Sequence, residues 1–141
     1  MEDEASPAMS LVNDDLYPVS LVGKHITTIA LIGPIRVVLD DYTIQIEEPE
    51  FDIQDGENIR HVRFNPAASE EPIGLDALGK LFGQEVTSAK ATEIGVLRVE
   101  LRHELTLILP AGTSYEPWSL RGPAGTLISL PSGGLTCVAS Q

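Results

Sequence analysis

The chain has 141 residues, of which 43% are hydrophobic, and it carries a formal net charge of −12. This length fits one domain, and the hydrophobic share is sufficient for a sizeable core, which excludes a disordered acidic chain. The charge disfavours nucleic acids and anionic membranes as partners because both repel a negative protein, and no apolar run approaches the length of a membrane span.

Residues 1–17 are expected to form a flexible acidic tail, because they are rich in acids and small residues and show no regular periodicity. The basic start and apolar segment of a secretory signal are missing from this stretch. We therefore expect a cytoplasmic protein whose single β-rich domain occupies residues 18–141.

Residues 21–46 are predicted to form an antiparallel meander of three strands. A β-branched run at residues 26–31 precedes a glycine–proline turn signal and a second strand with alternating apolar residues. The two-residue loop Asp40-Asp41 then places Leu39 opposite Tyr42 on the inner face of the hairpin.

Residues 81–109 repeat this arrangement. Both copies begin with the motif Leu-x-Gly-x-x-(Ile or Val)-Thr, at residues 21–27 and 81–87, and both continue into two alternating strands joined by a short loop. In the second copy this loop places Leu101 opposite Leu105. Because the insertions between the copies fall in turns, where a folded repeat tolerates them, we interpret the chain as an internal duplication.

The two meanders are expected to pack their sheets around one core. The residues predicted to lie in it alternate along the strands of both copies, namely Ile35, Val37, Leu39, Ile44, Leu97, Val99, Leu101 and Leu107. Between the copies, residues 59–64 also alternate as a strand, whereas residues 51–53 are predicted to form at most a short extension of the first meander. Leucines at helical spacing predict one short helix near residues 72–82, ending at Gly83.

Residues 115–138 are predicted to form a three-stranded antiparallel piece. Placing Leu120 opposite Thr126, and Leu130 opposite Leu135, gives its strands a common inner face.

Two side chains of this C-terminal piece are expected to be buried. Trp118 is expected to anchor the core. Cys137, the only cysteine, is expected to be a small buried hydrophobe on the inner face. A single cysteine excludes an internal disulfide.

These elements predict a mainly β protein, a β-rich α+β fold of two repeated three-stranded antiparallel meanders, one short helix between them and a C-terminal three-stranded antiparallel piece. Two C-terminal segments, Tyr115-Glu116-x-Trp118-x-Leu120-x-Gly122-Pro123 and Leu130-Pro131-x-Gly133-Gly134, accompany the duplicated motif. Together they resemble a small bacterial family of unknown function, over residues 21–138. The resemblance implies an intracellular bacterial protein of this shape, and it implies no activity, cofactor or catalytic residue.

The sequence assigns no residue a catalytic, cofactor-binding or metal-binding role. His25, His61 and His103 lack the spacing of a metal site, and the glycine-rich loops lack the helix and lysine of a phosphate loop. We therefore expect a protein that is not an enzyme and needs no cofactor. The alternative is a small hydrolase or ligand-binding β domain whose site assembles only in the fold, for example around Asp40 and Asp41.

A run of acids between the two copies is the candidate interaction surface. It consists of Glu47, Glu48, Glu50, Asp52, Asp55 and Glu57. Tyr115 is added to this surface as an aromatic contact, with a role as a structural anchor as its alternative. The expected partner is a basic protein, as toxins are for immunity proteins, or a second copy joined by edge-strand pairing. A purely solubilising role for the charge is the competing interpretation.

Overall fold

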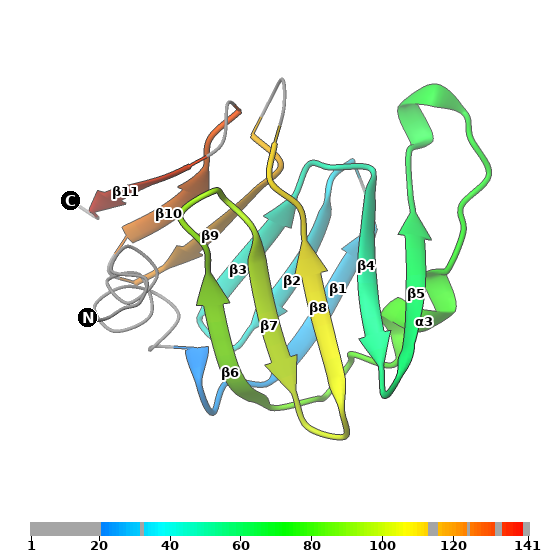
Figure 1. Cartoon of the computed structure of the whole chain (residues 1–141), viewed down its shortest axis with the longest axis horizontal. Coiled ribbons are helices and arrows are strands. Elements are labelled where there is room, and N and C mark those ends of the chain that lie inside the picture. The colour runs from blue at the N-terminus through cyan, green and yellow to red at the C-terminus, as the bar shows by residue number, and fades with distance from the viewer. Residues whose placement is uncertain (1–20, 32, 113–115, 124, 132–133, 140–141) are drawn as a thin grey trace.

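The protein is described by a computed structural model over residues 21–31, 33–112, 116–123, 125–131 and 134–139. Residues 1–17, expected to form a tail, and Tyr115 lie outside these ranges. Two antiparallel sheets form two layers (Figure 1). The six-stranded sheet has the order β1 (Ile26–Leu31), β2 (Ile35–Leu39), β3 (Tyr42–Ile46), β9 (Trp118–Gly122), β10 (Gly125–Ser129) and β11 (Leu135–Ala139). The five-stranded sheet has the order β5 (Asn58–Arg63), β4 (Glu50–Asp55), β8 (Leu105–Leu109), β7 (Leu97–Leu101) and β6 (Val86–Ala91).

This arrangement confirms the predicted mainly β fold with its two meanders and its C-terminal three-stranded piece. The short helix α3 (Leu75–Gly79) lies inside the predicted range, and a single 3-10 turn, η1 (Pro66–Ala68), precedes it. Ala77 and Leu78 are the buried residues of α3, and the helix packs beside β5 (Figure 1). None of the helices in the described part of the chain is long and apolar enough to cross a membrane.

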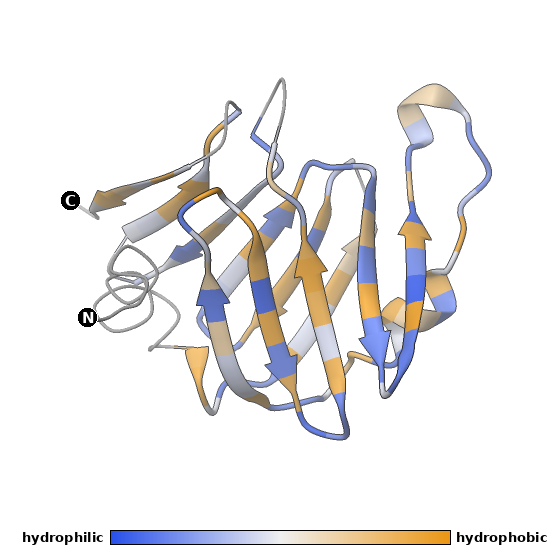
Figure 2. Cartoon of the chain, in the orientation of Figure 1, coloured by the Kyte–Doolittle hydropathy of each residue, from blue (hydrophilic) through white to orange (hydrophobic). Residues whose placement is uncertain are grey.

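The core lies between the two sheets and is built by strict alternation along the strands. In β2, β3 and β7 every second residue is buried, and Figure 2 shows the corresponding alternation of hydropathy along the ribbons. Every residue predicted to lie in the core is at most 4% exposed, and Trp118 is fully buried, as predicted. Its indole nitrogen donates a hydrogen bond to the backbone oxygen of Gly95 at 2.8 Å, which satisfies the one polar atom that burial would otherwise leave unpaired.

The strand pairing of the two meanders matches, as a duplication requires. The β1–β2 pair begins at Ile26 and Leu39, and its register shifts directly after that pair. The β6–β7 pair begins at Val86 and Leu101, which are the corresponding residues of the second copy, and its register shifts at the same place. A bulge shared by both copies is a structural feature that the sequence motif alone did not predict.

The duplication extends beyond the predicted three strands. After β3 the chain crosses to the other sheet, where β4 pairs with β8, and after β8 it crosses back, where β9 pairs with β3. The pairs are equivalent, because Ile44 lies opposite Leu120 and the corresponding Leu107 lies opposite Ile53. Each repeat therefore has five strands, three in one sheet and two in the other. The segment predicted to be a short extension is β4, an inner strand of its sheet.

The duplicated motif joins the two copies to each other. The amide of Ile26 donates to the oxygen of Gln84 at 3.0 Å, and the amide of Val86 donates to the oxygen of Lys24 at 2.8 Å. The amide of Gly23 donates to the oxygen of Val86, and the amide of Gly83 donates to the oxygen of Ile26. The four bonds form two equivalent pairs, because each bond from the first copy to the second is matched by the same bond from the second copy to the first. The leucines that open the motif, Leu21 and Leu81, are fully buried beneath this junction.

The register predicted for the C-terminal hairpins was wrong by one residue. Leu120 lies opposite Leu127 rather than Thr126, and Leu135 lies opposite Ser129 rather than Leu130. The first hairpin is tighter than predicted, since pairing continues to Gly122 and Gly125. A glycine is required at position 122, because a Cβ atom there would lie 2.2 Å from the ring of Tyr42.

The predicted burial of Cys137 was also wrong, because its side chain is exposed. It lies opposite Leu127, which is buried, so it occupies the inner side of the sheet as predicted. However, β11 is the outermost strand of the larger sheet and extends past the five-stranded sheet (Figure 1). The inner side of a strand is buried only where another layer covers it.

The two copies diverge after their fifth strand. In the first copy the amide of Arg63 donates to the oxygen of Ile73, and in the second the amide of Leu130 donates to that of Gly134, both at 2.9 Å. The second copy then continues as β11. The first copy turns into α3 at Gly74, where φ is +76° and where a Cβ atom would lie 2.2 Å from the backbone oxygen of His61.

Substituting Gly74 tests this divergence point. Gly74→Ala is expected to lower the free energy of unfolding by about 2–4 kcal/mol, because a left-handed backbone and a contact with a backbone oxygen are both penalised. Gly23→Ala is the matched control, since Gly23 also has a positive φ of +90° but nothing within 4 Å of its Cβ position. It should cost about 1–2 kcal/mol. Urea denaturation measures both, and equal losses would contradict the proposed steric role of Gly74.

Candidate functional site

The acidic run lies where the chain crosses from one sheet to the other. Glu47 and Glu48 follow β3 and precede β4, and their backbone amides donate to the oxygen of Pro117, at 2.8 and 3.0 Å. Pro117 immediately precedes β9. The two crossing links of the duplicated fold are therefore bonded to each other, and the first link is held in a defined position.

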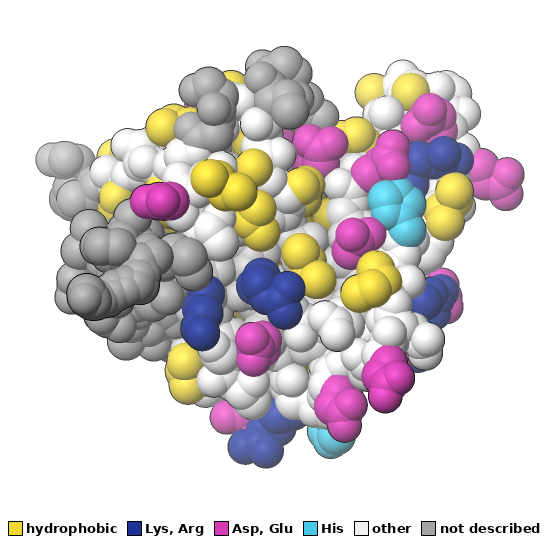
Figure 3. All heavy atoms as spheres, in the orientation of Figure 1, with side chains coloured by type: hydrophobic (Ala, Val, Ile, Leu, Met, Phe, Trp, Pro, Cys, Tyr) yellow, Lys and Arg dark blue, Asp and Glu magenta, His cyan; other side chains and the backbone are white. Residues whose placement is uncertain are grey.

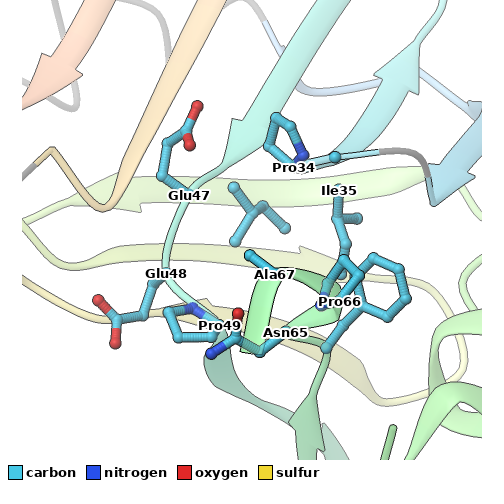
Figure 4. Close-up of a pocket in the computed structure, with 11 residues that line it drawn as sticks. Pro34, Ile35, Glu47, Glu48, Pro49, Asn65, Pro66 and Ala67 are labelled. Carbon is cyan, nitrogen blue, oxygen red and sulfur yellow. The ribbon is translucent and has the colours of Figure 1, made fainter. Parts of the chain in front are cut away.

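A hollow of about 400 Å³ opens beside this link. Its lining comes from the β2 entry, the β3–β4 link and η1, and consists of Gly33, Pro34, Ile35, Ile46, Glu47, Glu48, Pro49, Phe64, Asn65, Pro66 and Ala67. Pro34 faces Pro49 and Pro66 across the hollow (Figure 4). The walls are thus largely apolar and rigid, because proline fixes the backbone angle φ.

Among the described residues, Glu47 and Glu48 are the only charged ones that line the hollow, and their side chains point in different directions from the link (Figure 4). Glu47 is exposed and accepts a hydrogen bond from the side-chain amide of Gln45. Within the described ranges, neither carboxylate lies within salt-bridge distance of a lysine, arginine or histidine. Their charges therefore remain available to a ligand.

The next two acids of the run are engaged by a histidine. On the outer face of the five-stranded sheet, His61 lies between Asp52, with Nδ1 3.0 Å from its carboxylate, and Glu50, with Nε2 2.7 Å from its carboxylate. A histidine flanked by acidic side chains is visible over β5 in Figure 3. The hydrogen bond to Asp52, followed by that to Glu50, raises the pKa of His61 above its ordinary value of 6.5.

The last two acids lie at the far end of β4. The Asp55 carboxylate is 2.7 Å from Nζ of Lys80, which follows α3, and Glu57 is exposed in the β4–β5 turn. His61 and Lys80 thus offset part of the repulsion within the run. What remains uncompensated is concentrated at Glu47 and Glu48, beside the hollow, and at Glu57.

This arrangement is suited to a cation with an aliphatic stem. The proline walls and Phe64 offer apolar contact to the methylene groups of a lysine or arginine side chain, while the two carboxylates at the rim attract its charged head. No histidine, cysteine, serine, threonine or lysine lines the hollow in the described structure. The lining offers apolar contact, an amide side chain and two carboxylates.

Sequence reasoning found the acids but missed the hollow. The sequence places Phe64 at the end of a predicted strand, and it predicts no role for the residues that follow it. Their proximity to Pro34 depends on the pairing of β4 with β5, which was not predicted. The three prolines of the lining, Pro34, Pro49 and Pro66, are visible in the sequence and are a signal that could have been used.

The three histidines do not come together. His61 is held by acids on β4, His103 lies 3.0 Å from the side-chain oxygen of Gln84, and His25 lies near Asp40 and Glu85. Over the part of the chain that the structure describes, no group of three or more histidine, cysteine or acidic side chains is arranged to hold a metal ion.

The fold is a two-layer β protein in which each five-strand repeat contributes strands to both sheets. The site is an acidic hollow with proline walls, beside the link that crosses from one sheet to the other. The chain belongs to the family described as a family of unknown function, DUF6188, whose model matches residues 17–139. No curated protein and no solved structure matches the chain.

The His61 contact predicts a pH dependence of stability. Because the folded protein binds this proton more tightly than the unfolded chain, the contribution is fully present below the unfolded pKa of 6.5 and is lost as the pH rises through the raised folded pKa. An NMR titration of the imidazole should report a pKa above 6.5. Asp52→Asn should lower it more than Glu50→Gln, since Asp52 is the larger cause. A pKa that neither substitution changes would contradict this account.

Proposed function

We propose that the protein acts by surface contact rather than by catalysis, and that it binds a basic partner protein through the hollow beside Glu47 and Glu48. The observation that carries this proposal is the pairing of an apolar, proline-walled hollow with two carboxylates that have no cationic partner among the described residues. The intracellular bacterial setting that the sequence resemblance implies is part of the same proposal.

The proposed contact is the insertion of one arginine or lysine side chain of the partner. Its methylene groups would pack between Pro34 and Pro66, and its charged head would reach the carboxylates at the rim. Pre-set walls lower the entropy lost on binding, since few side chains need to be ordered. Such a charged anchor in a desolvated pocket is a frequent source of binding energy in protein interfaces.

The rest of the acidic run and the net charge of −12 support association at longer range. A strongly negative surface attracts a basic protein and raises its association rate, and salt weakens this effect. The same charge disfavours nucleic acids and anionic membranes as partners. An acidic protein that neutralises a basic toxin is one biological form that this class of contact takes.

The alternative class, a hydrolase assembled in the fold, has less support. Asp40 and Asp41 form the β2–β3 turn, where Asp41 lies 2.9 Å from Nζ of Lys24 and Asp40 accepts a hydrogen bond from the amide of His25. Both acids thus have structural partners in a hairpin turn. Neither acid lines the acidic hollow beside Glu47 and Glu48.

The proposed contact can be tested with a short glycine–serine peptide that carries one central arginine, and a citrulline peptide as its uncharged counterpart. Addition of the arginine peptide is expected to shift the amide NMR signals of Ile35, Asn65 and Ala67. Binding should weaken roughly tenfold in a Glu47→Gln/Glu48→Gln variant, because both rim charges are lost. Higher salt should weaken it as well.

A Glu93→Gln/Glu100→Gln variant is the matched control, since it changes the net charge equally at described residues away from the hollow. It should bind the arginine peptide almost as the unmodified protein does. Equal weakening in both variants, or equal shifts from the citrulline peptide, would overturn the proposal. Glu50 and Asp52 are unsuitable for this test, because replacing them also breaks the contact with His61.

A further inference from the structure

A second hollow, of about 390 Å³, lies on the outer face of the six-stranded sheet. It is lined by Arg36 on β2, Thr43 and Gln45 on β3, and Ser119 and Arg121 on β9. Each of these residues alternates with a buried neighbour along its strand, so all five side chains point away from the core. None of them contributes to the acidic hollow.

The strand register brings these side chains into two adjacent rows. Arg36, Gln45 and Ser119 lie opposite one another across three strands, and Thr43 lies opposite Arg121 in the next row on the same face. Arg36 and Arg121 lie two strands and one row apart, a separation of about 12 Å for strands about 4.8 Å apart with a rise of about 3.3 Å per residue. Two long guanidinium side chains at this separation can reach a small group that lies between them.

Hydrogen bonds hold one arginine in place and leave its terminal donors available. Nε of Arg36 donates to the side-chain oxygen of Gln45 at 3.2 Å, and the amide of Gln45 donates in turn to Glu47. Within the described residues, five lysines and arginines have carboxylate partners, namely Lys24, Arg60, Arg63, Lys80 and Arg102. The other four, Arg36, Lys90, Arg98 and Arg121, have none there, and two of them, Arg36 and Arg121, line the same hollow.

The second copy provides an internal comparison for this face. Arg36 and Thr43 correspond to Arg98 and Thr106, so the arginine and threonine occur in both copies. The other three positions differ, because Gln45 corresponds to Ile108, Ser119 to Asp52 and Arg121 to Gln54. The six-stranded sheet thus has a guanidinium where its counterpart has an amide, and a hydroxyl where its counterpart has a carboxylate.

The fold itself does not require this difference, since both sheets have the same pairing at these positions. Relative to its second-copy counterpart, Gln45 replaces an apolar side chain, Ser119 replaces a carboxylate, and Arg121 adds hydrogen-bond donors. Two acids lie near this face, and both are already engaged. Asp41, two residues before Thr43, lies 2.9 Å from Nζ of Lys24, and Glu47 accepts a hydrogen bond from Gln45. These carboxylates oppose an anion, and the two guanidinium groups supply positive charge that offsets them.

We propose that this hollow is a binding site for a compact oxyanion, a phosphate or a carboxylate group, held between the guanidinium groups of Arg36 and Arg121. Planar guanidinium groups bind both oxyanions through paired, charge-assisted hydrogen bonds. The hydroxyl groups of Thr43 and Ser119 supply further donors from the sheet surface. This inference concerns another face and the opposite charge from the acidic hollow, although the two sites are connected through Gln45, which bonds to both Arg36 and Glu47.

The test is an amide NMR titration of the full chain with inorganic phosphate, and separately with acetate, at constant ionic strength. The expected result is a saturable shift centred on Thr43, Ser119 and Arg121. Tighter binding of phosphate would identify a phosphate-bearing ligand, and tighter binding of acetate a carboxylate-bearing one. Shifts that do not saturate, or that spread evenly over the chain, would overturn the proposal.

Arg121→Gln installs the side-chain type of the corresponding second-copy residue, Gln54, and should weaken anion binding at least tenfold. Arg98→Gln is the matched control, because Arg98 is the counterpart of Arg36 on the other sheet and should leave the affinity unchanged. Thermal unfolding of each variant verifies that the fold persists, and Arg121→Lys gives a second, charge-conserving variant. Equal losses for Arg98→Gln and Arg121→Gln would refute the site.

Discussion

The four backbone hydrogen bonds between the duplicated motifs are the constraint on which the rest of the structure depends. They join Gly23 and Ile26 of the first copy to the corresponding residues of the second, with Lys24 and Gln84 as additional acceptors. The buried leucines beneath this junction, Leu21 and Leu81, attach it to the core. Because β1 and β6 both begin here, the junction fixes where each sheet starts and how the two layers lie relative to each other.

Each repeat shares its strands between the two sheets, and this sharing is the reason to expect that the two repeats unfold together. Each five-strand repeat places three strands in one sheet and two in the other, so neither copy can complete a sheet alone. Strands of both copies therefore contribute buried residues to each of the two sheets that enclose the core. The sharing also explains why β4, a strand rich in acids, occupies an inner position: alternation hides Phe51 and Ile53 on one side and leaves the polar residues on the other.

Local patterns predicted the meanders and their inner faces, because alternation and loop length are encoded within each hairpin. The two-residue loop at Asp40 and the three-residue loop at His103 gave the correct registers. The register predicted for the C-terminal hairpin was wrong because its glycines fit both a long loop and a tight turn. The contact of Gly122 with the ring of Tyr42, which is distant in sequence, could not be seen in the local pattern. The acids of the candidate site were predictable, whereas the hollow depends on contacts between three segments and was not.

The acidic link is a point where the two copies have lost their symmetry. The two crossing links are bonded to each other at Pro117, whose oxygen accepts from the amides of Glu47 and Glu48. In the second copy the residue that follows the meander is Pro110, the counterpart of Glu47, so no carboxylate stands at that position of the repeat. Glu116 nevertheless precedes Pro117 and is exposed, so the second link also carries a negative charge next to this contact in the chain. Like charges on the two links oppose each other, and the backbone bonds to Pro117 hold the links together against this repulsion.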